Sequence, residues 1–368
     1  MQLLPIRINR DILLFQTQLC HALIFFVPEC RMEQRIIDIF QRAYPNEKTR
    51  DNYLSRLRNL QKKFTVPLTR MLEDPDTHYT VIQEAYPSIT TRKNMLTTIL
   101  VIFREDEELR TKHAEAGARW KKLHDDLAKH QDAKIRRSEP EDKQIEKYTS
   151  YEEIEKKYRE LAKGTPHTSE RNSMQFMLLS ILVHLRPKRA DLGAVRIIRG
   201  SDPQQKDQNY IVLRKPAAGS SYLVMNMYKT SKHYRTVEEE MPAALVRDLE
   251  TSLKRWPREF LFRKDDGEPM TKNNTYSRFV MTTFEDMFGR STGVSLLRHI
   301  YISEKLELDN MTIEEQDAEA KLMLHTSGLQ RQYKWPKKVL CPKLCAAYIK
   351  PTKKTLKAKR KSRRQEEL

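Results

Sequence analysis

Three residues near the C-terminal end of the sequence have the chemistry needed to attack a phosphodiester. Arg298, His325 and Tyr333 occur in that order within residues 293–335. An arginine can hold the non-bridging oxygens of a phosphate, a histidine can donate or accept a proton, and a tyrosine oxygen can attack phosphorus. Each residue type also has a purely structural explanation, so the three favour a phosphoryl-transfer site only if the fold brings them together.

Two predicted helices provide that convergence. Apolar residues at helical spacing predict a helix beginning near residue 295, which carries Arg298. Thr312 is followed three residues later by Glu315, the pattern of a capping box, so a second helix begins there and runs toward His325. The tyrosine follows in a short polar segment a few residues beyond the histidine.

The amino-acid sequences of these segments resemble motifs of a known family. Leu297-Arg298-His299, and Met323-Leu324-His325-Thr326 leading to Tyr333, resemble the last two motif boxes of the tyrosine recombinase (phage-integrase) superfamily. Its members cut and rejoin DNA through a 3′-phosphotyrosyl bond. Upstream, residues 187–192 resemble the first arginine box, and Tyr228-Lys229-Thr230 resembles the lysine hairpin. The boxes resemble those of divergent integrases of large DNA viruses and mobile elements more than those of bacterial chromosome-resolution enzymes.

The resemblance implies a role for each matching residue. Arg189 and Arg298 would bind the two non-bridging oxygens, and Tyr333 would be the nucleophile. His325 would donate to an oxygen of the phosphorane or help to remove the tyrosine proton. Lys229 would protonate the departing 5′ oxygen as a general acid. No cofactor and no metal ion is expected, because side-chain cations take the place of the metal.

Two of these assignments have rivals nearby in the sequence. Arg189 stands two residues before Asp191, as in the divergent viral members, whereas the wider spacing of bacterial members would select Lys188. We favour Arg189. Lys232 competes with Lys229 for the hairpin position, and it is otherwise expected to contact DNA.

Ser295 is a departure from the family pattern. It stands three residues before the second arginine, where the family often has histidine or lysine. Serine can donate a hydrogen bond to phosphate but carries no charge. We therefore expect a slower enzyme, or a contribution from His299, although a side chain one residue after the arginine points in a different direction on a helix.

Composition indicates a polyanionic partner. The chain has 368 residues with 68 Lys and Arg and a net charge of +18, which favours nucleic acid over an anionic membrane surface. The resemblance narrows the expected nucleic acid to double-stranded DNA. The four cysteines, of which Cys341 and Cys345 form an isolated pair, fit a reducing compartment and predict neither a disulfide framework nor a metal site. Residues 11–27 are hydrophobic but interrupted by polar residues, so they are a poor membrane span and lack a signal-peptide cleavage pattern.

An amphipathic helix is predicted in the first half of the chain, after Asn46 as its N-cap. Tyr53, Leu57, Leu60 and Phe64 recur at helical spacing and form its apolar side. Its other side is basic, and we expect it to contact DNA phosphates. The residues concerned are Arg50, Arg56, Arg58, Lys62 and Lys63.

The predicted fold is mainly α with a small antiparallel sheet. Strands are expected at 195–198, 210–213, 222–228 and 237–241, and a long exposed helix is expected within 104–147. The predicted organisation is an uncertain extension (1–31), a helical DNA-clamp or core-binding bundle (32–135), a linker (136–148), a catalytic domain (149–348) and a basic tail (349–368).

The resemblance implies a site-specific recombinase or integrase that works as a homo-tetramer on two duplexes, without a membrane. It would act in the nucleus or wherever its target DNA lies. A segment after the tyrosine, at 339–348, would form a short helix reaching the neighbouring protomer. Two alternatives stay open: a type IB topoisomerase, which has the same chemistry but acts as a monomer, and a catalytically decayed relative that only binds DNA.

Overall fold

The computed structural model describes residues 28–64, 67–271 and 274–349. The chain divides into two compact units, Met1–Arg136 and Arg137–Leu368. The hydrophobic stretch 11–27, most of the predicted extension 1–31 and nearly all of the predicted basic tail lie outside the described residues. In the described ranges, no helix has both the length and the apolar character needed to cross a membrane.

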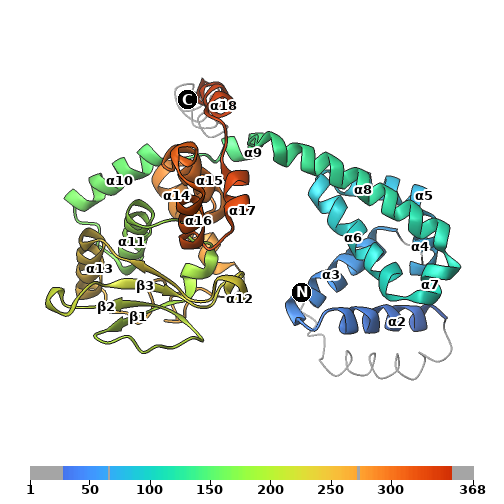
Figure 1. Cartoon of the computed structure of the whole chain (residues 1–368), viewed down its shortest axis with the longest axis horizontal. Helices are drawn as coiled ribbons and strands as arrows, with labels where there is room; N and C mark the ends of the chain where they lie inside the picture. The colour runs from blue at the N-terminus through green and yellow to red at the C-terminus, as the bar shows by residue number, and fades with distance from the viewer. Residues whose placement is uncertain (1–27, 65–66, 272–273, 350–368) are drawn as a thin grey trace, which may run out of the picture. The chain divides into compact units, whose positions relative to one another are not determined.

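The first unit is helical (Figure 1). Its helices are α2 (Pro28–Ala43), α3 (Glu47–Phe64), α4 (Leu68–Glu73), α5 (Pro75–Ala85), α6 (Ile89–Glu105), α7 (Glu107–Lys112) and α8 (Ala114–Arg137). The predicted cap Asn46 accepts from the backbone of Thr49 at 3.0 Å, before α3. Asp74 caps α5 in the same way. Pro75 occupies the first position of this helix, which suits proline because it lacks the amide proton that a helix start leaves unpaired.

The long helix α8 is anchored more firmly than its charged sequence predicts. Trp120 is fully buried and donates its indole N–H to the carbonyl of Leu72 at 3.1 Å. Leu109 and Leu127 are buried in the same core. Trp120 and these two leucines therefore complete the core of the unit.

The second unit is built around a four-stranded sheet. Its helices are α9 (Asp142–Ile145), α10 (Tyr151–Lys163), α11 (Glu170–His184), α12 (Ser231–Tyr234), α13 (Ala243–Arg255), α14 (Thr275–Phe288), α15 (Val294–Glu304), α16 (Ile313–Leu322), α17 (Ser327–Tyr333) and α18 (Lys337–Ile349). Three short 3-10 helices are η1 (Ala190–Ala194), η2 (Pro216–Ala218) and η3 (Leu308–Asn310). The mainly α fold with a small sheet is thus confirmed.

The sheet is mixed, which corrects the expectation of a purely antiparallel one. The strands β1 (Val195–Arg199), β2 (Asn209–Leu213), β3 (Tyr222–Met225) and β4 (Val237–Glu240) lie in that order. β2–β3 and β3–β4 are antiparallel, but β1 and β2 run parallel. The connection between them returns across the outer side of the sheet, where Asp202 accepts hydrogen bonds from the hydroxyls of Tyr210 and Tyr222, both at 2.8 Å.

The other side of the sheet faces the main core. Ile211, Leu213, Leu223 and Met225 point toward α11 and α13, which cover this side (Figure 1). Most of α11 is buried, because its sequence is apolar on nearly all sides. Leu296 and Leu297 of α15, beside Arg298, and Leu324, beside His325, are buried in the same core.

Local signals place the ends of these helices. Ser150 and Glu153 form a capping box at the start of α10, and Thr312 and Glu315 form the predicted one of α16. α16 ends at Leu322, three residues before the histidine. The tyrosine differs from the prediction, because it is the last residue of a short helix, α17, rather than part of a polar coil.

Candidate active site

The fold brings Arg298, His325 and Tyr333 into direct contact. The guanidinium of Arg298 donates from Nη1 to the hydroxyl of Tyr333 at 3.1 Å and lies 4.6 Å from the centre of its ring. Nη2 of the same arginine donates to Nδ1 of His325. The rings of His325 and Tyr333 are stacked with centroids 5.6 Å apart. Three residues from three separate elements thus form one cluster.

His325 is held as a neutral imidazole with a defined tautomer. A guanidinium only donates, so Nδ1 accepts and the ring proton is on Nε2. Burial, assisted by the positive charges of Arg298 and Arg189, lowers the pKa of His325 to about 3. The histidine is therefore suited to donate a hydrogen bond from Nε2, and it is not a cation at neutral pH.

Arg298 is 1% exposed. Burial lowers its pKa to about 10, with Arg189 lowering it further and Tyr333 opposing the shift. The guanidinium remains charged at neutral pH. A buried cation of this kind acts through a low-dielectric environment, where it stabilises negative charge more strongly than it would in water.

Arg189 joins the cluster through the backbone that precedes the histidine. Its Nη2 donates to the carbonyl of Leu324 at 2.5 Å and to the hydroxyl of Thr230 at 3.1 Å. Thr230 itself donates to the same carbonyl at 3.1 Å. One carbonyl therefore connects the first arginine, the turn after β3 and the loop of His325.

Leu324 adopts an unusual backbone conformation at this junction. Its φ is +60°, in the left-handed region, although its side chain is fully buried. A side chain with a Cβ rarely adopts this conformation, and such strain is concentrated at functional sites. Here it turns the Leu324 carbonyl toward Arg189 while His325 faces Arg298.

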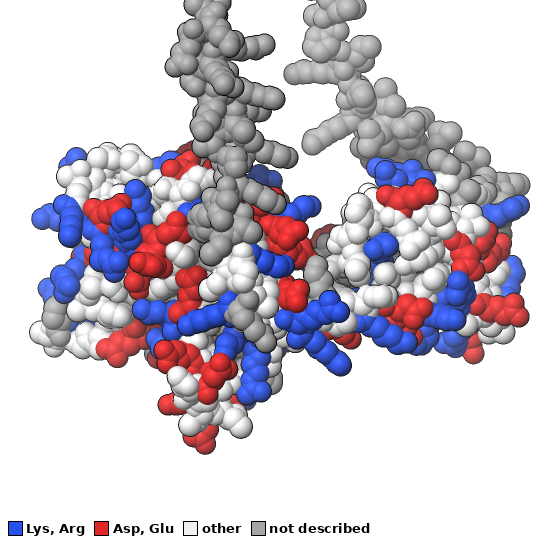
Figure 2. Space-filling view, turned by 90° about the horizontal axis from the view of Figure 1, so that it is seen from above, with Lys and Arg blue, Asp and Glu red and all other residues white. Residues whose placement is uncertain are grey.

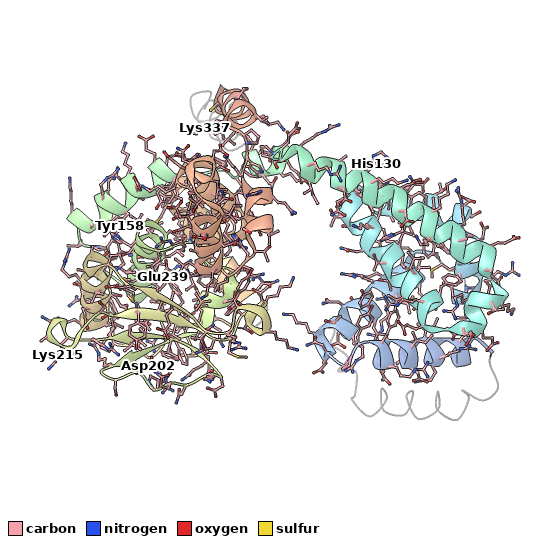
Figure 3. All side chains as sticks on the ribbon, viewed as in Figure 1. His130, Tyr158, Asp202, Lys215, Glu239 and Lys337 are labelled. Atoms are coloured by element: carbon pink, nitrogen blue, oxygen red, sulfur yellow. The ribbon has the colours of Figure 1, made fainter. Side chains whose placement is uncertain are left out.

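Lys188, the rival of Arg189, is engaged elsewhere. Its ammonium donates to the carboxylate of Glu239 on β4 and to the carbonyl of Leu322, and the side chain is 1% exposed. Figure 3 labels Glu239 in the interior of the second unit. Arg186 pairs with Glu319 at 2.5 Å and with Glu239 at 3.4 Å. These two basic residues thus attach α16 to the sheet, and Arg189 alone of the three contacts the cluster.

Several buried polar atoms of the cluster have no hydrogen-bond partner within the described residues. They are Nε of Arg298, Nε2 of His325, Nε of Arg189 and Oδ2 of Asp191. The last two lie 4.0 Å apart, an ion-pair distance that is too long for a hydrogen bond. Burial raises the pKa of Asp191, and Arg189 opposes that shift. Unpaired buried donors are costly unless a ligand completes them, and the two nitrogens on Arg298 and His325 suit an anion.

Two predicted lysines and one predicted serine are exposed. Lys229 lies in the turn between β3 and β4, directly before Thr230, as predicted. Lys232 lies on α12. Ser295 is in the first turn of α15, one turn before Arg298, and its hydroxyl makes no hydrogen bond within residues 28–64, 67–271 and 274–349. Lys229 and Lys232 are within two residues of Thr230 in the sequence, and Ser295 is three residues before Arg298. None of these three side chains contacts the cluster.

The basic side of α3 is present as predicted but is not uniform. Arg58, Lys62 and Lys63 are exposed and form no ion pair with the described part of the chain. Arg50 is half-buried, and Arg56 lies over the ring of Tyr53 at 5.4 Å. Figure 2 shows basic and acidic side chains interspersed on the face that it displays.

Sequence reasoning missed three contributors to the cluster. Thr230 was noted only as the neighbour of a lysine, and Leu324 only as part of a box. His299 was considered weak because it follows Arg298 on a helix, but its Nδ1 contacts the backbone carbonyl of Tyr333 at 2.8 Å. No local signal marks these roles, since each depends on a partner more than thirty residues away.

Comparison with solved structures shows a likeness in fold. No family model and no curated protein matches the chain. The chain is similar to a solved structure titled "Crystal structure of XerA recombinase", at 11% sequence identity over 86% of this chain and 99% of that chain, with a TM-score of 0.36. At that identity and TM-score, support for a function has to come from the geometry of the site.

Proposed function

We propose that the chain cleaves and rejoins double-stranded DNA through a phosphotyrosyl intermediate, as a site-specific recombinase. The observation that carries the proposal is the direct contact of Arg298 with both Tyr333 and His325. A tyrosine held against a buried guanidinium, beside an unpaired imidazole N–H, is arranged to attack a phosphate.

Each step then has a group to perform it. The hydroxyl oxygen of Tyr333, which is partly exposed, loses its proton to water as it attacks phosphorus, the bond from phosphorus to the 5′ oxygen breaks, and the strand remains attached through its 3′ phosphate. Arg298 and Arg189 bind the non-bridging oxygens, and Nε2–H of His325 donates to the charge that develops on them. Removal of one such donor reduces rates by about a hundredfold or more.

Lys229 supplies the proton to the departing 5′ oxygen in this proposal. It lies one residue from Thr230, which contacts Arg189, and its exposure leaves it accessible to a bound duplex. Reversal of the same steps with a different 5′ hydroxyl rejoins the strands. The phosphotyrosyl bond retains the energy of the broken bond, so rejoining needs no ATP.

The chemistry is tested with nicked suicide DNA substrates, in which the cleaved fragment diffuses away and the covalent adduct accumulates. Wild type should form an adduct that migrates as protein plus DNA, and Tyr333→Phe should form none. Tyr301→Phe is the matched control, because Tyr301 is a half-buried tyrosine on α15 outside the cluster, and it should form the adduct. Tyr348→Phe tests the other tyrosine near the C-terminus. Formation of the covalent adduct by Tyr333→Phe would contradict the proposal.

The recombinase assignment is tested separately from the cleavage chemistry. DNA carrying two copies of the cleaved site should be recombined, and the complex should contain four protomers by light scattering. Relaxation of supercoiled DNA by a monomer, without exchange between sites, would replace the recombinase by a topoisomerase.

A further inference from the structure

We infer that His299 is the residue that positions the nucleophile, through a hydrogen bond to the backbone of Tyr333 and a stack of aromatic rings behind it. This inference rests on the proposed function, in which Tyr333 attacks phosphorus. The proposed function assigns no role in phosphate binding to His299.

The hydrogen bond fixes the end of α17. Nδ1 of His299 lies 2.8 Å from the carbonyl oxygen of Tyr333. A carbonyl only accepts, so Nδ1 carries the proton and donates it. The two rings also meet edge to face, with centroids 4.5 Å apart.

Consecutive residues of α15 therefore hold opposite ends of the tyrosine. Arg298 donates to the phenol oxygen at 3.1 Å, and His299 donates to the main chain of the same residue. Tyr333 is the last residue of α17, where the helix leaves its final carbonyls without intrahelical partners. The imidazole N–H satisfies one of them and ties the nucleophile to the helix that carries the phosphate-binding arginine.

A stack behind the imidazole prevents it from turning away. The ring of His299 is stacked on Trp335 with centroids 4.3 Å apart and an interplanar angle of 17°. Trp335 is 2% exposed, and its backbone N–H donates to the hydroxyl of Ser303 on α15 at 2.9 Å. The ring of Trp335 also contacts that of Tyr148, with ring centroids 6.1 Å apart.

Tyr148 is itself attached to α15. Its hydroxyl donates to the carboxylate of Glu304, at the end of α15, at 2.5 Å. The neighbouring Thr149 shares a 2.9 Å hydrogen bond with Thr292, just before α15 begins. The segment that leads into α10 therefore contacts both ends of the helix. The row of ring contacts from Tyr148 through Trp335 to His299 ends on the same helix. Such a closed arrangement restricts the rotamer of His299.

His299 performs this role as a neutral group. Burial lowers its pKa to about 4, and the adjacent charge of Arg298 acts in the same direction. It therefore contributes a hydrogen bond and ring contacts at neutral pH, without adding positive charge to the site.

Two variants separate the hydrogen bond from the stack. His299→Phe keeps a flat ring against Trp335 but loses the donor. His299→Asn loses the ring but places an amide N–H close to the position of Nδ1. Single-turnover adduct formation is measured on two suicide substrates, one ordinary and one with sulfur in place of the bridging 5′ oxygen, which leaves without a general acid.

Misplacing a nucleophile by about 1 Å costs up to about a hundredfold in rate. We expect His299→Phe to slow adduct formation roughly ten- to a hundredfold on both substrates, with unchanged DNA affinity and melting temperature. His299→Asn should recover part of the loss. Lys229→Ala should be slow only on the oxygen substrate. Wild-type rates in His299→Phe, or a loss in His299→Asn alone, overturn the inference.

A second readout does not depend on activity. Amide hydrogen exchange of residues 331–337 should be faster in His299→Phe than in wild type. If wild type forms no adduct, the proposed function fails, while exchange still reports whether His299 holds the backbone of Tyr333. Unchanged exchange together with unchanged rates means that His299 positions nothing.

Discussion

The guanidinium of Arg298 donates to the hydroxyl of Tyr333 at 3.1 Å, while its other terminal nitrogen donates to His325. The group proposed to bind phosphate is thus already in contact with the proposed nucleophile. A phosphate oxygen that enters this site meets both at once, together with the unpaired Nε2–H of His325. In the proposed reaction, these contacts would leave little rearrangement to precede attack.

The first prediction concerns the fork geometry of Arg298. Arg298→Lys keeps a positive charge, but an ammonium cannot contact the tyrosine, the histidine and a phosphate in the same planar arrangement. We expect single-turnover adduct formation to fall by about a hundredfold or more at saturating DNA. Arg290→Lys, at a paired arginine outside the cluster, serves as the control. Cleavage by Arg298→Lys at the rate of the control variant would show that the planar guanidinium of Arg298 is not required.

The second prediction concerns the backbone of Leu324, whose φ is +60°. Leu324→Ala and Leu324→Gly both remove the buried side chain, but only glycine adopts this conformation without strain. Leu324→Gly should therefore be more stable than Leu324→Ala by about 1 kcal/mol in urea unfolding. At Leu297, buried within α15, the order should reverse, because glycine destabilises a helix by about 1 kcal/mol relative to alanine. The same order at both positions would contradict the assignment of strain.

The third prediction concerns stability in acid. His325 and His299 have folded pKa values lowered to about 3 and about 4, against an ordinary value of 6.5. Above pH 6.5 both are neutral in the folded and unfolded states, so they add no pH dependence. As the pH falls below 6.5, the unfolded state binds protons first, and stability is lost progressively down to about pH 3. The free energy of unfolding, measured from pH 7 to pH 4, should fall less steeply in His325→Asn than in wild type. Parallel curves would show that the histidine titrates normally.

The fourth prediction separates Arg189 from Lys188. Lys188→Met leaves the carboxylate of Glu239 buried with only the more distant Arg186, so it should destabilise the second unit by about 2–5 kcal/mol. The double variant Lys188→Met/Glu239→Leu should recover much of that loss. Arg189→Ala should instead abolish cleavage at little cost to the melting temperature. If the folded fraction of Lys188→Met is inactive and Arg189→Ala is active, Lys188 rather than Arg189 is the phosphate-binding residue.

The fifth prediction concerns α3 as a DNA contact. Replacing Arg58, Lys62 and Lys63 by Gln should weaken binding across all DNA sequences. The slope of log affinity against log salt should become shallower by about 0.9 for each lost phosphate contact. The same change at Lys121, Lys122 and Lys129 on α8 provides a control of equal charge. Adduct formation at saturating DNA should not change, and an equal salt slope in both triple variants would assign no special role to α3.

The sequence by itself determined the features that depend on a few neighbouring residues. The capping boxes at Ser150 and Thr312 were predictable because the cap and its partner are three residues apart. The buried helix α11 was predictable from its continuous apolar run. The positions of the four strands followed from the same kind of local pattern, although β3 ends at Met225, before the predicted boundary.

Only the tertiary structure decided relationships between distant segments. The parallel pairing of β1 and β2 depends on a connection that crosses the outer side of the sheet, and no residue in either strand encodes that path. Lys188 and Arg189 are adjacent and both basic, yet one is buried against Glu239 while the other reaches the carbonyl of Leu324. Burial and the identity of a partner far along the chain set these outcomes. For that physical reason, spacing in the sequence could name the candidates for the site but not arrange them.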